Sequence, residues 1–238
     1  MNADLEMTLA PEPSVTASDN IMDVQIDQQS FGLRMTDTTE GRSSASLLIN
    51  KMYSWRGYAG THKLNDDPNR ITLTATRNGE VCGTITVGLD SPSGILADEI
   101  FKEEIDKYRA RGAKVCEFTK LAIDSDVQSK TALASLFHLA VIHARDLHGC
   151  TDLFIEVNPR HRRFYEMTLG FKRQCEQKIN PRVNAPAHLL WVSLEYIRQE
   201  VQRVGGTGAA NEGERSFYRM FFSAREEAGI IQRLKDRR

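Results

Sequence analysis

The sequence predicts an α/β (α+β) fold in which a mixed β-sheet lies between helices on both of its faces, giving three layers. Two observations carry this prediction. The strand patterns Ile71–Arg77 and Glu80–Leu89 flank Asn78-Gly79, a dipeptide typical of two-residue hairpin turns. Farther along, helical and strand patterns alternate from Ile95 to Ile197, as expected for a sheet covered by helices.

Each element follows from a local pattern. Helices are predicted where apolar residues recur at helical spacing between capping residues and glycines. They are Ser44–Tyr58, Ile95–Arg111, a long helix that Asp124–Asp126 would cap and Gly149 would end, Arg162–Leu169 and Arg215–Lys235. Strands are predicted where apolar and β-branched residues alternate or form short runs. They are Ile71–Arg77, Glu80–Leu89, Val115–Ile123, Leu153–Val157, Phe171–Lys178 and His188–Ile197.

The two ends of the chain differ from its centre. Residues 1–30 hold six acidic and no basic residues and lack apolar periodicity, so we expect a disordered acidic tail. The remainder has 31 basic against 26 acidic residues, a net charge of +5 that suits an acidic partner or an ordinary solvated surface. We expect one domain over residues 31–200. Residues 201–238 would form a glycine-rich linker and a C-terminal helix packed on that domain.

Several classes of function are disfavoured. The four cysteines show no C-x-x-C pair, which argues against a zinc or redox site and suits a reduced, cytoplasmic protein. No signal peptide, long apolar run, P-loop, G-x-G-x-x-G or H-E-x-x-H pattern occurs. His138, His143 and His148 recur every fifth residue, which spreads them around a helix and does not form a metal-binding face. Basic residues are not interleaved with stacking aromatics, so nucleic acid is a weak candidate partner.

Two side chains could perform acid–base chemistry. Strand alternation places Glu117 on the face of Val115, Thr119, Leu121 and Ile123, where burial would raise its pKa and suit a base acting on an ammonium group. A structural ion pair is the alternative. Tyr165 could protonate a departing thiolate, or it could be a half-buried core tyrosine.

The segment around Asn158 is polar and basic. Asn158 could bind the amide arm of a pantetheine, or it could form an Asx turn before Pro159. Six potentially cationic residues lie within fourteen positions, at Arg160, His161, Arg162, Arg163, Lys172 and Arg173. At a helix N-terminus they would favour a phosphate or an acidic protein surface, and a solvated charged face is the alternative.

Several blocks in the same order make the chain resemble the GNAT superfamily and, within it, the FeeM-like long-chain N-acyl amino acid synthases, relatives of the acyl-homoserine lactone synthases. The blocks are Asn78–Thr86, Asp90–Gly94, Glu117–Ala122, Asn158–His161 with Phe164-Tyr165, Asn184–Ala187 and Ser216–Ser223. The resemblance covers residues 31–238. It implies a GNAT-like fold and N-acyltransferase activity on an amino acid.

The resemblance also implies the donor. Acetyl-CoA-dependent relatives carry a glycine-rich turn after the central strand, but Val127–Leu133 contains no glycine. The implied donor is therefore the acyl-phosphopantetheine thioester of an acyl carrier protein, with no bound cofactor and no metal. Lys130 would meet the phosphate, and Arg160–Arg163 with Lys172 would contact the acidic carrier. The lipid product could bring the enzyme into peripheral contact with a membrane.

The implied mechanism is direct attack of the acceptor amine on the thioester. Glu117 would accept a proton, the backbone N–H groups of Leu121 and Ala122 would bind the oxyanion, and Tyr165 would assist the thiolate. Lys120 matches the basic position of the E-x-x-R pattern in acyl-homoserine lactone synthases, although alternation points it away from Glu117. Arg56 could bind the substrate carboxylate, or it could be a surface arginine. The alternatives are an acetyl-CoA-dependent acetyltransferase, an acyl-homoserine lactone synthase and a non-catalytic module that senses carrier protein or lipid.

Overall fold

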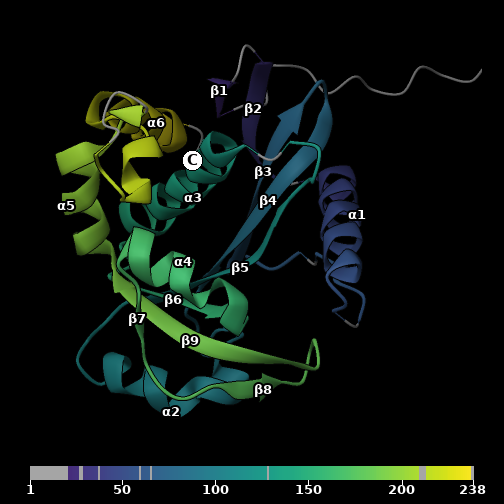
Figure 1. Ribbon diagram of the computed structural model, residues 1–238, viewed down its shortest axis with the longest axis vertical. Coiled ribbons are helices and arrows are strands. Elements are labelled where there is room, and N and C mark those ends of the chain that lie inside the picture. Colours follow the sequence, from purple (N-terminus) through teal and green to yellow (C-terminus); the bar gives the residue numbers. More distant parts are fainter. Residues whose placement is uncertain are drawn as a thin grey trace, which may run out of the picture.

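The computed structural model describes residues 21–26, 29–36, 38–58, 60–64, 66–127, 129–208 and 213–236. Within these residues the strands form a mixed sheet in the order β1-β2-β3-β4-β5-β6-β9-β7, with β8 paired to β9 (Figure 1). The strands are β1 Met22–Ile26, β2 Gln29–Met35, β3 Arg70–Arg77, β4 Glu80–Leu89, β5 Val115–Ile123, β6 Asp152–Val157, β7 Lys172–Arg173, β8 Lys178–Asn180 and β9 Ala185–Ser193. β5 and β6 run parallel, whereas the other described pairs are antiparallel.

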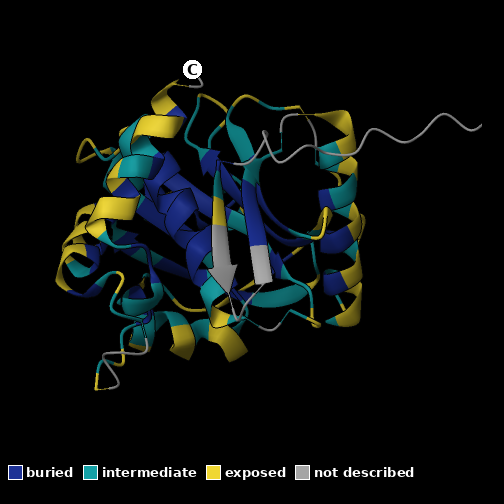
Figure 2. Cartoon of the chain, turned by 90° about the horizontal axis from the view of Figure 1, so that it is seen from above, coloured by how far each residue is buried: buried dark blue, intermediate teal, exposed yellow. Residues whose placement is uncertain are grey.

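Helices cover both faces of this sheet, which confirms the predicted three layers. The helices are α1 Thr39–Trp55, α2 Asp98–Arg109, α3 Lys130–Ile142 with a π-helical continuation His143–Leu147, α4 Pro159–Leu169, α5 Leu194–Val204, a 3₁₀ turn Phe217–Met220 and α6 Ala224–Asp236. Helices α3 to α6 share the largest apolar core with one face of the sheet. On the other face, α1 and α2 each close a smaller core (Figure 1). Figure 2 shows buried residues in the middle of the molecule and exposed ones on the outer faces of the helices.

Most predicted elements are present, and the differences concern their ends. The hairpin turn is confirmed, because Asn78 and Gly79 both have positive φ, at 54° and 84°. Helix α4 begins at Pro159 and not at Arg162, since the Asn158 side chain accepts the N–H of Arg160 and caps the helix. Helix α3 is capped by Ser129 and not by Asp124–Asp126.

Three predictions in the C-terminal half were wrong. The strand predicted to reach Ile197 ends at Ser193, whose side chain accepts the N–H of Tyr196 and starts α5. The strand predicted over Phe171–Lys178 is replaced by the short strands β7 and β8. The single helix predicted over Arg215–Lys235 is a 3₁₀ turn followed by α6, and part of the predicted linker, residues 209–212, lies outside the described residues.

The predicted tail also differs from the structure where it is described. β1 and the start of β2 fall within residues 1–30, and the side chain of Ile21 is buried in the main core. The rest of the predicted tail, residues 1–20, 27 and 28, lies outside the described residues. No described helix combines the length and apolarity needed to cross a membrane.

A β-bulge in β5 shapes the centre of the sheet. Thr86 pairs with Thr119 and Thr84 with Ala122, so a single β4 residue faces both Lys120 and Leu121. Lys120 has a φ of 51°, and its carbonyl accepts the hydroxyl of Thr84 at 2.8 Å. The extra residue reverses the alternation of β5. Before it, Glu117 lies on the α2 face of the sheet, whereas after it Leu121 and Ile123 pack into the core under α3.

A buried polar contact holds the C-terminal segment on α3. His138 accepts the N–H of Phe222 at 3.0 Å through Nδ1, and its Nε2 lies 3.6 Å from the Glu227 carboxylate, which also pairs with Arg145. Burial alone would raise the pKa of Glu227, but His138 and Arg145 outweigh it and lower the pKa to about 2. Because this pKa is depressed, the contact stabilises the fold above the pKa of an unfolded Glu, about 4.3, and is lost as the pH falls toward 2.

We predict that Glu227→Gln lowers the free energy of unfolding by about 2–4 kcal/mol, because it removes one charge from a largely buried ion pair. Chemical denaturation would measure the loss, and hydrogen exchange would show faster exchange in residues 213–236. Glu176→Gln is the matched control. Its side chain is 85% exposed, so its stability should change by no more than about 0.5 kcal/mol. Equal stabilities for the two variants would contradict this role of Glu227.

Candidate active site

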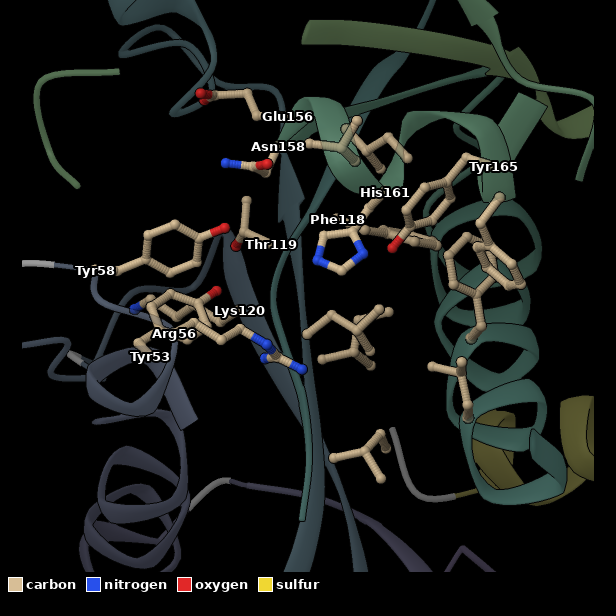
Figure 3. A pocket seen from close by; sticks show the side chains of 18 residues that line it. Tyr53, Arg56, Tyr58, Phe118, Thr119, Lys120, Glu156, Asn158, His161 and Tyr165 are labelled. Atoms are coloured by element: carbon tan, nitrogen blue, oxygen red, sulfur yellow. The ribbon is translucent and has the colours of Figure 1, made fainter. Parts of the chain in front are cut away.

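The site lies where β5 and β6 separate. The two parallel strands pair only from Val115–Asp152 to Phe118–Ile155. Beyond this point β5 continues through the bulge to Ile123, whereas β6 ends at Val157 and the chain turns at Asn158 into α4. Two adjoining cavities, of about 420 and 320 Å³, open at this separation. Figure 3 shows the residues that line the first of them.

The first cavity lies on the α3 face of the sheet and is largely apolar. Its apolar walls come from β4, β5, α3, β6 and α4, through Ile85, Phe118, Leu121, Ile123, Leu133, Phe137, Ile155, Val157 and Phe164. Polar groups gather at one end, where Arg56 extends from the end of α1 and His161 and Tyr165 extend from α4 (Figure 3). The cavity therefore offers an apolar channel that leads to a polar end.

The second cavity lies on the α2 face, and more of its lining residues have polar side chains. It is lined by the segment after α1, by Leu96 before α2, and by the chain from Asn180 to Ala187. Its polar side chains include His62, Lys120, Asn180 and Arg182. The two cavities share Tyr53, Tyr58, Phe118, Thr119, Lys120, Glu156, Val157 and Asn158. The shared residues form a junction at the gap between the strands, so molecules bound on opposite faces of the sheet could meet there.

Tyr165 lies in the first cavity, with its hydroxyl on the side of His161 (Figure 3). Burial raises its pKa to about 12, against a smaller lowering by Arg56. The phenol therefore stays protonated at neutral pH and could donate a proton. The pKa of His161 is lowered by burial and then by Arg160 and Arg56, and its Nε2 accepts a hydrogen bond from Arg160 at 3.2 Å. His161 is thus favoured in its neutral form.

Arg56 and Lys120, two predicted substrate-binding residues, both line a cavity. Lys120 lies at the junction and donates to the carbonyl of Lys63 at 3.0 Å. Burial and then Arg70 lower its pKa, while the charge of Glu117 opposes them. The prediction that Lys120 points away from Glu117 was wrong, because the bulge at Lys120 breaks the alternation on which it rested.

The residues of the predicted basic cluster have different surroundings in the structure. Asn158 lines both cavities, and Arg160 donates to the Tyr58 hydroxyl at 3.1 Å at their rim. Arg162 pairs with Glu166 at 3.5 Å, and Arg163 is exposed. Two further residues lie outside both cavities: Lys172 lies over the ring of Trp191 at 5.9 Å, and Lys130 starts α3.

Glu117 is buried and has no contact with either cavity. Its side chain is 1% exposed and lines neither cavity. One carboxylate oxygen accepts the N–H of Leu96 at 2.7 Å and a guanidinium N–H of Arg70 at 3.1 Å, and the other accepts the N–H of Ala97 at 3.0 Å. Burial raises its pKa against these contacts. The catalytic role of Glu117 stays a prediction, and its contacts fit a group that holds the segment before α2 on the sheet.

The side chains of the two residues predicted to supply the oxyanion site point to opposite faces of the sheet. Leu121 lines the first cavity, but Ala122 packs under α1 with Leu48, Ile49 and Met52 and lines neither cavity. Sequence reasoning missed Thr119, Tyr58 and Glu156 at the junction. Glu156 carried a usable signal, because it is a carboxylate that interrupts an otherwise buried strand directly before Asn158. Among the described residues no group of three or more His, Cys, Asp or Glu could hold a metal ion.

This fold and site define an acyltransferase, and the comparisons with known proteins identify its family. A family model described as "N-acyl amino acid synthase FeeM" matches residues 44–193, which is more than half of the chain. The chain therefore belongs to the FeeM family of N-acyl amino acid synthases. The structure of FeeM from uncultured soil microbes is 27% identical, with a TM-score of 0.64 over 71% of this chain and 94% of that chain.

Two more distant structures share the fold. The acyl-homoserine lactone (AHL) synthase LasI is 12% identical, with a TM-score of 0.54 over 70% of this chain and 91% of LasI. A protein of Lactobacillus plantarum described as an N-acetyltransferase is 14% identical, with a TM-score of 0.50 over 69% of this chain and 98% of that chain. The GNAT-like fold is thereby confirmed. No curated protein sequence matches the chain.

We predict that Glu117→Gln lowers the free energy of unfolding by about 2–4 kcal/mol, because hydrogen bonds and an ion pair to a buried carboxylate are weakened together. The exposed residue Glu80 at the start of β4 gives the control Glu80→Gln, which should stay within about 0.5 kcal/mol. Turnover per folded molecule should fall little. A loss of turnover of about a hundredfold or more at unchanged stability would instead support Glu117 as the base.

Proposed function

We propose that this enzyme transfers a long-chain fatty acyl group from an acyl carrier protein to the amine of an amino acid, yielding an N-acyl amino acid. The observation that carries the proposal is the junction between two unlike cavities. A cavity with an apolar wall on one face of the sheet meets, where β5 and β6 separate, a cavity on the other face that has more polar side chains in its lining. A lipid thioester and a small polar amine need two such spaces.

The first cavity suits the donor. Its apolar walls can take up a fatty chain, since burying each CH₂ group stabilises the bound state by about 0.8 kcal/mol. The thioester would then lie at the polar end beside Tyr165, whose protonated phenol could donate to the departing thiolate. The unpaired strand edges between Thr119 and Asn158 leave backbone groups for the amides of a pantetheine arm.

The second cavity suits an amino acid. Lys120 lines it, and among the described residues its ammonium group donates to the Lys63 carbonyl, so further donors remain for a carboxylate. Arg56 lines only the first cavity, so it would reach a substrate carboxylate from the donor side of the junction. The backbone N–H of Leu121, on the wall of the first cavity, is our candidate donor to the oxyanion of the intermediate.

A carrier protein fits the surface better than CoA. The loop before α3 lacks the glycines with which acetyl-CoA-dependent relatives bind a pyrophosphate, whereas a carrier's phosphopantetheine has one phosphate. Lys130 at the start of α3 could meet that phosphate. The half-buried Arg162 and the exposed Arg163 on α4 could contact the acidic carrier beside the cavity. Such a donor places the reaction in the cytoplasm, as the reduced cysteines also suggest.

We predict that the purified protein, incubated with palmitoyl-carrier protein and a panel of amino acids, forms an N-acyl amino acid detectable by mass spectrometry. Acetyl-CoA with a polyamine or peptide acceptor, and the carrier with S-adenosylmethionine, serve as comparison reactions. Product only from acetyl-CoA would indicate an acetyltransferase. A lactone product only from S-adenosylmethionine would indicate an acyl-homoserine lactone synthase.

A second prediction concerns the carrier. Reversing Arg162 and Arg163 together to Glu should raise the KM for acyl-carrier protein about tenfold at low salt, with a smaller effect at high salt. Arg160 is left intact because it holds Tyr58 at the cavity rim. Lys102→Glu with Lys107→Glu, on exposed positions of α2 across the sheet, is the matched control and should change little. An unchanged KM in the α4 variant would remove this surface from carrier binding.

A further inference from the structure

We propose that Glu156, on β6, is the catalytic base that accepts a proton from the ammonium group of the acceptor. This inference rests on the proposed function. Of the described residues that line the two cavities, Glu156 is the only carboxylate, and it lines both. It directly follows Ile155, the last β6 residue that pairs with β5, so it is the first β6 side chain past the separation.

Its side chain points to the acceptor side of the sheet. Alternation in β6 buries Leu153 and Ile155 in the core under α3, and Phe154 in the core under α2. Glu156 therefore extends toward α2, into the second cavity, with Thr119 and Asn158 beside it (Figure 3). An amine bound in this cavity would lie between the carboxylate and a thioester arriving through the gap.

The carboxylate is held in place yet keeps acceptor capacity. One oxygen accepts the side-chain amide of Asn180 at 2.6 Å, and the other pairs with Arg182. Arg182 is itself held by the carbonyl of Leu96 at 2.9 Å and by Glu99. An ionised carboxylate offers about four acceptor sites, so these two contacts fix its orientation without exhausting it.

The surroundings of Glu156 raise the basicity of its carboxylate. The side chain of Glu156 is 9% exposed, and burial raises its pKa, reinforced by the charge of Glu117 and opposed by Arg182 and Asn180. Glu117 differs in lining neither cavity, so its carboxylate has no path to an acceptor. The two carboxylates thus have separate tasks: Glu117 positions the chain before α2, and Glu156 faces the substrate.

The proton balance of the reaction is complete with these groups. The acceptor ammonium has three protons. One passes to Glu156 and frees the lone pair, which attacks the thioester carbon and forms the C–N bond as the C–S bond breaks. One is transferred to the leaving sulfur through the Tyr165 phenol, and one stays on the amide nitrogen. Glu156 then returns its proton to water.

The test is Glu156→Gln assayed with acyl-carrier protein and a saturating amino acid acceptor. At neutral pH we expect kcat to fall by about a hundredfold or more. Activity should recover as the pH rises toward the pKa of the amine itself, since a deprotonated amine needs no base. Glu156→Asp should restore part of the activity. A purely structural role would lower kcat by the same factor at every pH, and that result would overturn the proposal.

Glu99→Gln is the matched control, because Glu99 also pairs with Arg182 but lines neither cavity. Its kcat and pH profile should equal those of the wild type. An equal loss in Glu99→Gln would mean that loosening Arg182 causes the effect, and this would also overturn the assignment. If the wild type forms no N-acyl product, the proposed function itself fails. If the wild type forms product and Glu156→Gln has the same kcat, only the role of Glu156 fails.

Discussion

The site depends on one constraint, the separation of two parallel strands in the middle of a sheet. β5 and β6 share hydrogen bonds as far as Phe118 and Ile155 and then separate. Interior strand edges normally stay paired, because an unpaired buried N–H or C=O group costs free energy. Here the bulge at Lys120 and the Asn158-Pro159 turn redirect the two chains. The resulting gap connects the two faces of the sheet, and in the proposed reaction the lipid donor and the polar acceptor would meet there.

Burial of Glu117 supports this arrangement. The ring of contacts from Arg70, Leu96 and Ala97 fixes the chain that enters α2, and Leu96 lines the second cavity. Gly88 on β4 makes room for the carboxylate, because a Cβ there would lie 2.8 Å from the Glu117 side chain. Glu117, the acid that interrupts the central strand, therefore shapes the wall of the second cavity through Leu96.

Much of the fold follows from local signals, but the site required tertiary information. Asn78-Gly79, the alternation of β3 and β4 and the apolar stripe of α3 each act locally, and all three predictions held. The bulge could not be foreseen, because it puts the non-glycine residue Lys120 at positive φ and depends on pairing with Thr84 and Thr86. Because the bulge reverses the alternation, the expectation that Leu121 and Ile123 share a face with Glu117, which assumed a regular strand, was wrong.

The two carboxylates on the α2 face, Glu117 and Glu156, differ in their access to the cavities. Burial raises the pKa of both Glu117 and Glu156, so the shift alone would not tell a structural acid from a catalytic one. Backbone N–H groups at Leu96 and Ala97 occupy Glu117, whereas Glu156 is oriented by side chains and borders both cavities. Ionised Glu117 also disfavours charge on its neighbour. A fixed carboxylate beside the cavities thus raises the basicity of Glu156, the carboxylate that we propose as the base.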